Sequence, residues 1–183
     1  MRIVPFVRRV VLPAIAITAV LGTVSGVSAG RAGVTLADVR QATVKYQNLS
    51  AALRDGYGRF YICTDNETRG VGAMGQHFVK GSLVGDPEID PLHPEALMYA
   101  PKPGGGWKFV GMEYVVIKAA WDAVHPGTVP TVLGQRLRLV PAGNRYGLPD
   151  FYERHLWLWR NNPSGIFQDW NPKVSCRGTG DPA

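Results

Sequence analysis

Three ionisable side chains, His77, Glu113 and His155, each lie in a predicted strand row that is largely apolar or aromatic. Side chains alternate between the two faces of a strand, and neighbouring strands place them about 5 Å apart. If the three segments are strands that face one interior, two imidazoles and a carboxylate meet beneath indole rings. The three expected rows are Gly75, His77 and Val79; Gly111, Glu113, Val115 and Ile117; and Glu153, His155, Trp157 and Trp159.

The preferred interpretation is a pocket that binds a small molecule. The two tryptophans, with Tyr114 or Tyr99, would supply flat apolar walls, and the ionisable groups would orient a ligand through hydrogen bonds. A further polar contact is expected from Gln135, which follows Gly134 in another apolar segment. The candidate ligand-binding residues are therefore His77, Glu113, Gln135, His155, Trp157 and Trp159.

A second interpretation is an enzyme. His77, Glu113 and His155 have the ligand types of a metal centre with two histidines and one carboxylate, fit for hydrolysis or for a metal-dependent oxidation. The same three groups also suit general acid–base catalysis. Strong metal signatures place histidines at fixed local spacing, whereas these residues come from separate segments. No pattern identifies a cofactor.

A third interpretation is a structural or surface-interaction protein without pocket chemistry. A lone histidine on an apolar strand face is commonly a hydrogen-bonded core residue. A buried carboxylate at Glu113 is costly unless it is paired. Its partner would be His77, Arg154 or Arg160, and the sequence leaves this choice open.

Several segments that would position these residues are rich in aromatic and β-branched side chains, as strands are. Turn signals such as Asp86-Pro87 and Gly143-Asn144 divide them at intervals too short for crossover helices, which favours antiparallel pairing. The predicted strands cover residues 59–63, 74–79, 95–99, 107–117, 132–140 and 151–159.

One helix is predicted over residues 35–53. Thr35 and Asp38 form a capping-box pattern at its start, and Asp55-Gly56 marks its end. The apolar stripe must be buried, so we expect an α+β fold in which this helix packs on a curved antiparallel sheet, a meander or half-barrel. The stripe consists of Leu36, Val39, Ala42, Tyr46, Leu49 and Leu53.

The first 29 residues have the build of a cleavable signal peptide. Three arginines precede an apolar run of fifteen residues, 10–24, and small residues precede a cleavage site after Ala29. The run is shorter than the roughly 20 residues of a membrane-spanning helix. We therefore expect a secreted or extracytoplasmic protein with one globular domain over residues 30–183 and no stable membrane span after cleavage.

The export route bears on metal loading, because the twin-arginine route carries folded proteins. Arg8-Arg9 fits the core of that signal, but Val7 stands where a serine or threonine is usual. The general secretory route is therefore preferred.

Two cysteines, Cys63 and Cys176, are the only ones in the chain. In an oxidising compartment, two thiols in one small domain predict a disulfide. The bond would close a loop that spans most of the predicted domain.

The charge of the chain gives little reason to expect an anionic partner. The formal net charge is +6 for all 183 residues, and removing Arg2, Arg8 and Arg9 with the signal leaves +3. Nucleic-acid binding calls for a clustered basic face, whereas these cations are scattered. Nucleic acid is therefore excluded as a partner, a small molecule is expected, and the oligomeric state is not specified.

Four segments taken together, residues 72–79, 113–116, 155–160 and 162–165, resemble a family of secreted bacterial proteins that has no established activity. The tryptophan-rich run over residues 155–160 is the most specific part. Lys80 departs from the pattern, which has a small polar residue there. The resemblance implies secretion and covers most of the predicted domain, but it implies no reaction, cofactor or site residue.

Overall fold

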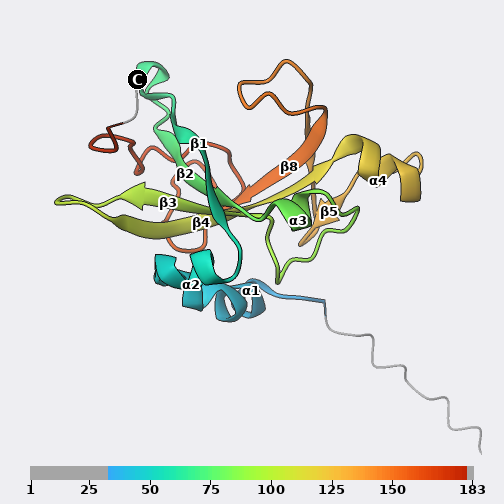
Figure 1. Ribbon diagram of the computed structural model, residues 1–183, viewed down its shortest axis with the longest axis horizontal. Helices are drawn as coiled ribbons and strands as arrows, with labels where there is room; N and C mark the ends of the chain where they lie inside the picture. The colour runs from blue at the N-terminus through green and yellow to red at the C-terminus, as the bar shows by residue number, and fades with distance from the viewer. Residues whose placement is uncertain (1–32, 181–183) are drawn as a thin grey trace, which may run out of the picture. The chain divides into compact units, whose positions relative to one another are not determined.

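A computed structural model describes residues 33–180. The predicted signal peptide, its cleavage site after Ala29 and the start of the predicted domain at residue 30 lie outside these residues. The described part has an α+β fold, in which short N-terminal helices lie beside a curled, half-barrel antiparallel sheet (Figure 1). The predicted fold class is confirmed.

The first helical segment starts where the sequence predicts. Thr35 caps α1 (Leu36–Thr43): its hydroxyl accepts a hydrogen bond from the Asp38 amide, and the Asp38 carboxylate accepts one from the Thr35 amide at 2.8 Å. This is the expected capping box.

The prediction of one continuous helix over residues 35–53 is wrong. A 3-10 turn, η1 (Val44–Gln47), follows α1, and a second helix, α2 (Leu49–Arg54), begins after Asn48. Asn48 has an extended backbone, and its side chain accepts a hydrogen bond from the Ser50 amide at 3.0 Å. A side chain that caps a new helix in this way competes with continuation of the old one.

Six strands form the main sheet, and every neighbouring pair is antiparallel. The first four follow one another as a meander, and the chain then returns so that β8 pairs with β4 and β7 lies at the edge. In sheet order the strands are β1 (Gly58–Asp65), β2 (Ala73–Val79), β3 (Ala96–Pro101), β4 (Trp107–Ile117), β8 (Phe151–Leu156) and β7 (Arg138–Val140).

The predicted strand over residues 132–140 is instead three short strands. β5 (Thr131–Val132) and β6 (Gln135–Arg136) form a small hairpin of their own, and β7 joins the main sheet. Leu133 and Gly134 both have positive φ, at 50° and 75°. Two such residues make a tight hairpin turn that reverses the chain.

Three short helical elements connect the strands: η2 (Glu67–Arg69), α3 (Gly81–Val84) and α4 (Lys118–Val124). They had not been predicted. None of the helices within residues 33–180 is long and apolar enough to span a membrane.

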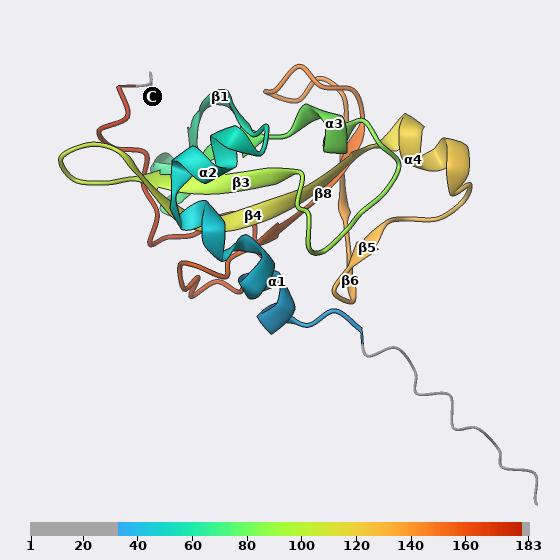
Figure 2. The same ribbon diagram turned by 60° about the horizontal axis from the view of Figure 1, so that its bottom comes forward.

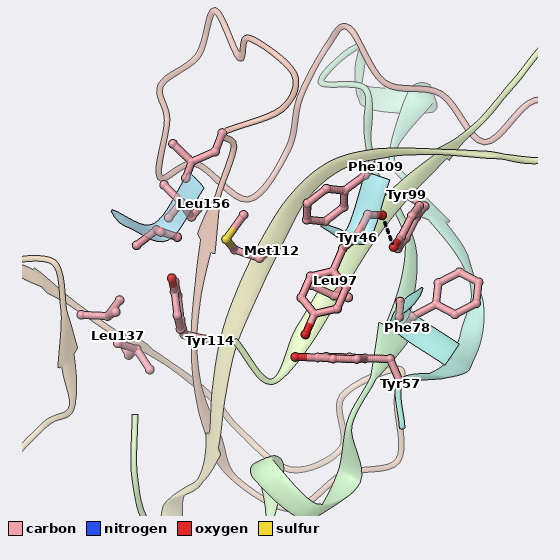
Figure 3. Close-up of a cluster of buried hydrophobic side chains, with 14 of the residues drawn as sticks. Tyr46, Tyr57, Phe78, Leu97, Tyr99, Phe109, Met112, Tyr114, Leu137 and Leu156 are labelled. Carbon is pink, nitrogen blue, oxygen red and sulfur yellow. Dashed lines mark hydrogen bonds between the residues drawn. The ribbon is translucent and has the colours of Figure 1, made fainter. Parts of the chain in front are cut away.

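The helices α1 and α2 cover one face of the sheet, which we call the helix face (Figures 1 and 2). The core on this face is strongly aromatic, and Figure 3 shows part of it. Tyr99 is fully buried there, and its hydroxyl donates a 2.7 Å hydrogen bond to the carbonyl oxygen of Tyr46. The aromatic members of this core include Tyr46, Tyr57, Phe78, Tyr99, Phe109 and Tyr114.

The opposite face carries a second, smaller cluster, made of Cys63, Ala73, Met98, Val110, Trp157, Val174 and Cys176. Cys63 and Cys176 form the predicted disulfide, with Cα atoms 5.7 Å apart. The C-terminal segment lies close to β2 here, since Ala73 pairs with Asn171. A Cβ at Gly72 would lie 2.1 Å from the Asn171 carbonyl oxygen, so the approach requires glycine.

Candidate functional site

His77, Glu113 and His155 come from three strands, β2, β4 and β8, and meet on the face opposite the helix face, which we call the site face. Glu113 and His155 are direct partners in the β4–β8 register. Their side chains therefore point the same way from neighbouring strands.

His77 is separated from Glu113 by the whole of β3, yet the two side chains meet. Ala96 on β3 is the direct partner of Glu113, and Met98 is the partner of His77. The methyl group of Ala96 leaves room for the longer side chains to meet above it. Met98 packs instead against Gly111. A Cβ atom at position 111 would lie only 2.7 Å from the terminal methyl carbon of Met98.

The distances place the three groups in one cluster. His77 Nε2 lies 3.4 Å from Glu113 Oε2, and His155 Nε2 lies 3.9 Å from Glu113 Oε1. The two imidazole rings stand edge to face, with centroids 5.9 Å apart. All three residues are buried, and His155 has no exposed surface at all.

A second layer of charged groups surrounds His155. Asp169, from the C-terminal segment, places Oδ1 3.6 Å from His155 Nδ1. Arg138 on β7 contacts Glu153 and also lies 2.9 Å from Asp169 Oδ2. Glu153 and Asp169 thus share one guanidinium, whereas Glu113 faces the imidazoles.

Burial controls the protonation of the innermost groups. It raises the pKa of Glu113 well above its usual range, and the negative charge of Glu153, with a hydrogen bond between the two carboxyl groups, adds to that effect. Burial and the neighbouring His155 together lower the pKa of His77 to about 3, against a backbone hydrogen bond to Gly75 that raises it. At neutral pH, His77 is therefore an uncharged imidazole, and the surroundings of Glu113 favour its protonated form.

The pKa of Asp169 shifts in the direction opposite to that of Glu113. Burial raises its pKa, but His155, Arg138 and Arg154 outweigh that effect and hold the pKa below its usual value. The Asp169 carboxylate is therefore ionised beside the His155 ring.

Both ring nitrogens of His155 are buried without a hydrogen-bond partner. Leaving one buried polar atom unpaired costs about 1–3 kcal/mol, so two on one ring demand an explanation. Among the described side chains, His125 Nε2 is also unpartnered, but its ring stacks on Trp121 with centroids 4.0 Å apart. His155 instead lies among three carboxyl groups and a second imidazole.

A cavity of about 290 Å³ opens onto this cluster. His77 and Glu113 form its polar end, and Tyr146 also lines it. The Tyr146 hydroxyl lies 3.8 Å from the Met74 sulfur. The remaining walls are apolar or glycine backbone. They consist of Phe60, Val79, Gly81, Val84, Gly85, Val115, Leu148 and Phe151.

The two tryptophans do not line this cavity. Trp157 belongs to the site face but lies in the disulfide cluster, where its indole N–H donates to the Gln168 carbonyl oxygen at 2.5 Å. Trp159 lies on the helix face, where its indole N–H donates to the Thr43 hydroxyl at 3.3 Å. Trp159 does not share a face with His155 and Trp157, as had been expected, because β8 ends at Leu156 and the alternation of side chains ends there too.

The other expected wall and contact residues also lie elsewhere. Tyr99 and Tyr114 are buried in the helix-face core. Gln135 is exposed on the β5–β6 hairpin. Of the three partners considered for Glu113, His77 makes the contact, at 3.4 Å. Arg154 and Arg160 donate to the carbonyl oxygens of Arg136 and Lys173.

Sequence reasoning missed several members of the site. Glu153 stands two residues before His155, so strand alternation places it on the same face, and Phe151 precedes it in the same row. Asp169 and Tyr146 lie in irregular segments, where no periodic pattern reports which way a side chain points. Phe60 is found only through the β1–β2 register, which pairs it with His77.

The donor set has the chemistry of a transition-metal site. Imidazole nitrogens and a carboxylate oxygen from His77, Glu113 and His155 all lie within 4.8 Å of one another, and Glu153, His155 and Asp169 form a second such group.

Comparison of the chain with protein-family models, curated proteins and solved structures found no match, so its function is inferred from this geometry.

Proposed function

We propose that this protein binds a small, largely apolar molecule in the cavity of the site face. The observation that carries the proposal is the cavity itself, whose walls are apolar except at one end, where His77 and Glu113 meet. Binding pockets for small molecules typically combine an apolar lining with a few convergent polar groups.

The size and polarity of the cavity define the class of ligand. A volume of about 290 Å³ is at the lower end of the range for ligand pockets. A charged ligand group would lose its hydration without a full opposite charge to meet it. The preferred ligand therefore has an aliphatic or aromatic body and one neutral polar group, such as a hydroxyl or a carbonyl.

The polar end is suited to such a group. Protonated Glu113 can donate a hydrogen bond to a carbonyl oxygen, and uncharged His77 offers one ring nitrogen as an acceptor for a hydroxyl. Phe60, Tyr146 and Phe151 would contact the body of the ligand, in the role that the sequence had suggested for the tryptophans.

We place this binding function outside the cytoplasm. The Cys63–Cys176 disulfide supports this, because such bonds persist in oxidising compartments. The arginines, apolar run and small residues of the first 29 positions support it as well, as does the resemblance to secreted bacterial proteins.

The test is saturable binding of a neutral apolar fluorophore, N-phenyl-1-naphthylamine, and its displacement by phenol, indole and 1-hexanol. Val84→Trp on α3 would fill the cavity from its wall and should abolish binding. Val124→Trp on α4, at a position that is 54% exposed and outside the cavity lining, is the matched control and should bind normally. A ligand at a hundredfold excess over its Kd should also stabilise the fold by about 2.7 kcal/mol.

Two results would overturn the proposal. One is a lack of saturable binding of the fluorophore and all three competitors by the folded wild-type protein. The other is equal binding by wild type and the Val84→Trp variant, which would place the fluorophore elsewhere.

A further inference from the structure

We propose that His77, Glu113 and His155 form a binding centre for one divalent first-row transition-metal ion at the polar end of the cavity, and that Asp169 positions His155 for it. This inference goes beyond the proposed function and does not depend on it, because the ion needs only the polar end of the cavity. With the ion bound, the polar group of an apolar ligand would face the ion instead of Glu113 and His77.

The spacing of the donor atoms suits one ion. Two ligands about 2.1 Å from a tetrahedral ion are about 3.4 Å apart. His77 Nε2 and Glu113 Oε2 are separated by 3.4 Å, and His155 Nε2 and Glu113 Oε1 by 3.9 Å. Small side-chain rotations would bring all three donor atoms within bonding distance of one ion.

The unpartnered ring of His155 is the independent observation that points to a missing ligand. The side chain is fully buried, and neither ring nitrogen has a hydrogen-bond partner. An ion at Nε2 would satisfy one nitrogen. The other, Nδ1, lies 3.6 Å from Asp169 Oδ1 and would donate to it after a slight approach.

This arrangement matches the usual surroundings of a metal-bound histidine, whose second nitrogen donates to a carboxylate or a backbone carbonyl. His77 has a corresponding partner, since its ring makes a backbone hydrogen bond to Gly75. Both imidazoles are thus oriented by groups that would not themselves bind the ion. Asp169 and Gly75 are positioning groups in this sense.

The balance of charge also favours a cation. Glu113, Glu153 and Asp169 converge on His155, and Arg138 pairs with the latter two acids. Glu113 faces the imidazoles of His77 and His155 instead. A divalent ion at this point would displace the proton of Glu113 and balance the carboxylate charge that results.

The donor types select the class of ion. Two imidazole nitrogens and one carboxylate oxygen suit zinc, iron or cobalt, whereas calcium and magnesium prefer sites made of oxygen atoms. With three protein ligands, a position on the ion stays open, as in catalytic rather than structural zinc sites. Since His77 and Glu113 line the cavity, that position would face it.

The second group of possible ligands, Glu153, His155 and Asp169, competes for the same histidine. Glu153 and Asp169 already contact Arg138. Metal binding there would separate both carboxylates from their guanidinium, so the centre that includes His77 and Glu113 is favoured.

The experiment uses the full chain after native export and processing, stripped with a chelator and titrated with Zn²⁺ by calorimetry and with Co²⁺ by visible absorption. We expect one ion per chain and d–d bands that report nitrogen and oxygen ligands. His77→Ala, His155→Ala and Glu113→Gln should each weaken Zn²⁺ binding more than a hundredfold, and Asp169→Asn should weaken it 10- to 100-fold.

Two variants serve as controls. His93→Ala removes an exposed histidine that pairs with Asp90 and should leave Zn²⁺ affinity unchanged. Glu153→Gln tests the competing ligand group: glutamine can keep a hydrogen bond to Glu113, so Zn²⁺ binding should persist and be weakened less than in Glu113→Gln. Circular dichroism and the Cys63–Cys176 disulfide would establish that each variant is folded.

The inference is overturned if folded wild-type protein binds no stoichiometric Zn²⁺ or Co²⁺, or if His93→Ala loses affinity as strongly as His155→Ala. It is also overturned if Glu153→Gln abolishes binding while Glu113→Gln retains it. The two proposals fail separately: Val84→Trp should lose the fluorophore and keep the metal, whereas His155→Ala should lose the metal and keep the fluorophore.

Discussion

The helix face and the site face of the sheet both bury polar side chains, but they differ in how those groups are paired. On the helix face, three buried tyrosines each donate to a backbone carbonyl oxygen. The acceptors of Tyr57, Tyr99 and Tyr114 are Pro94, Tyr46 and Pro91, at 2.7, 2.7 and 2.8 Å. The phenol rings fill the core while their hydroxyl groups keep a partner.

On the site face, the side chains that fill the interior are stronger hydrogen-bonding groups with fewer partners. His155 has two unpaired ring nitrogens, and Glu113 is surrounded by other acids and imidazoles. Since the helix face gives each of these tyrosine hydroxyls a hydrogen-bond acceptor, a fold selected for stability alone could have an apolar residue in place of His155 on the site face. The difference supports the proposal that the helix face serves stability, whereas the site face gives up stability to hold a ligand.

The disulfide provides the first test of this comparison, because it ties the C-terminal segment, and with it Asp169, over the site face. Replacing Cys63 and Cys176 with alanine opens a loop with a sequence separation of 113 residues. The chain-entropy model puts the loss at about 4.7 kcal/mol. Urea denaturation of the double variant should show a loss of this order.

Reduced wild-type protein is the matched control and should lose a similar amount. A loss below about 1 kcal/mol in both would show that the C-terminal segment is held mainly by contacts such as the Ala73–Asn171 bridge.

A buried acid beside the helix face allows a second test, through pH. Glu95 accepts a 2.9 Å hydrogen bond from the Val115 amide, yet burial, with smaller contributions from the charges of Asp86 and Asp90, raises its pKa to about 8. Its folded-state pKa is thus above the ordinary 4.5, so the folded protein holds the proton more tightly than the unfolded chain does. Stability should therefore fall as the pH rises from about 4.5 to 8.

Glu95→Gln should flatten this dependence, because glutamine resembles the protonated acid and keeps an acceptor for Val115. At about 1.36 kcal/mol for each pKa unit, the difference between 4.5 and 8 limits the Glu95 contribution to about 5 kcal/mol. The measurement is the free energy of unfolding in urea from pH 5 to pH 8.5. The pKa of Glu113 is also raised, so its titration would leave some dependence of stability on pH in the Glu95→Gln variant. An identical slope in wild type and Glu95→Gln would contradict the assignment.

Much of the fold could be predicted because local patterns encode it. The long β4 matches its predicted residues 107–117 at both ends, and the capping box fixed the start of α1. The disulfide was predictable from two cysteines in a domain that the sequence predicts to be exported. Predictions failed where one residue changes the backbone direction, as at Asn48 between the helices and at Leu133 in the hairpin.

The candidate site was only partly predictable. Strand alternation explains why Glu113 and His155 share a face, but the meeting of His77 with Glu113 depends on the small Ala96 between them and on the register of β3. Asp169 is placed by a loop and a disulfide rather than by a periodic pattern. The tryptophans could not be placed correctly from alternation, because the residue where β8 ends is set by tertiary contacts, among them the hydrogen bond from the Trp157 amide to the Ile166 carbonyl oxygen.

Removing one phenol hydroxyl tests whether the hydrogen bonds of the buried tyrosines stabilise the helix face. Tyr99→Phe would leave the buried carbonyl oxygen of Tyr46 without its donor and should cost about 1–3 kcal/mol. Tyr61→Phe, at a side chain that is 44% exposed, is the control and should change stability by less than about 0.5 kcal/mol. If urea denaturation gives equal small losses for both, the tyrosine hydroxyls do not contribute the stability assigned to them.

The smallest expected effect is the most informative, because it concerns an equally buried residue on the other face. In metal-free protein, His155→Leu removes two unpaired ring nitrogens and replaces them with an apolar side chain of similar size. The desolvation penalty that disappears should offset the lost contacts of the ring with His77 and Asp169, so the free energy of unfolding should change by less than about 1 kcal/mol. A loss above about 2 kcal/mol in urea would mean that His155 is a paired structural residue like Tyr99. A near-zero change means that the histidine is kept at this position for something other than folding.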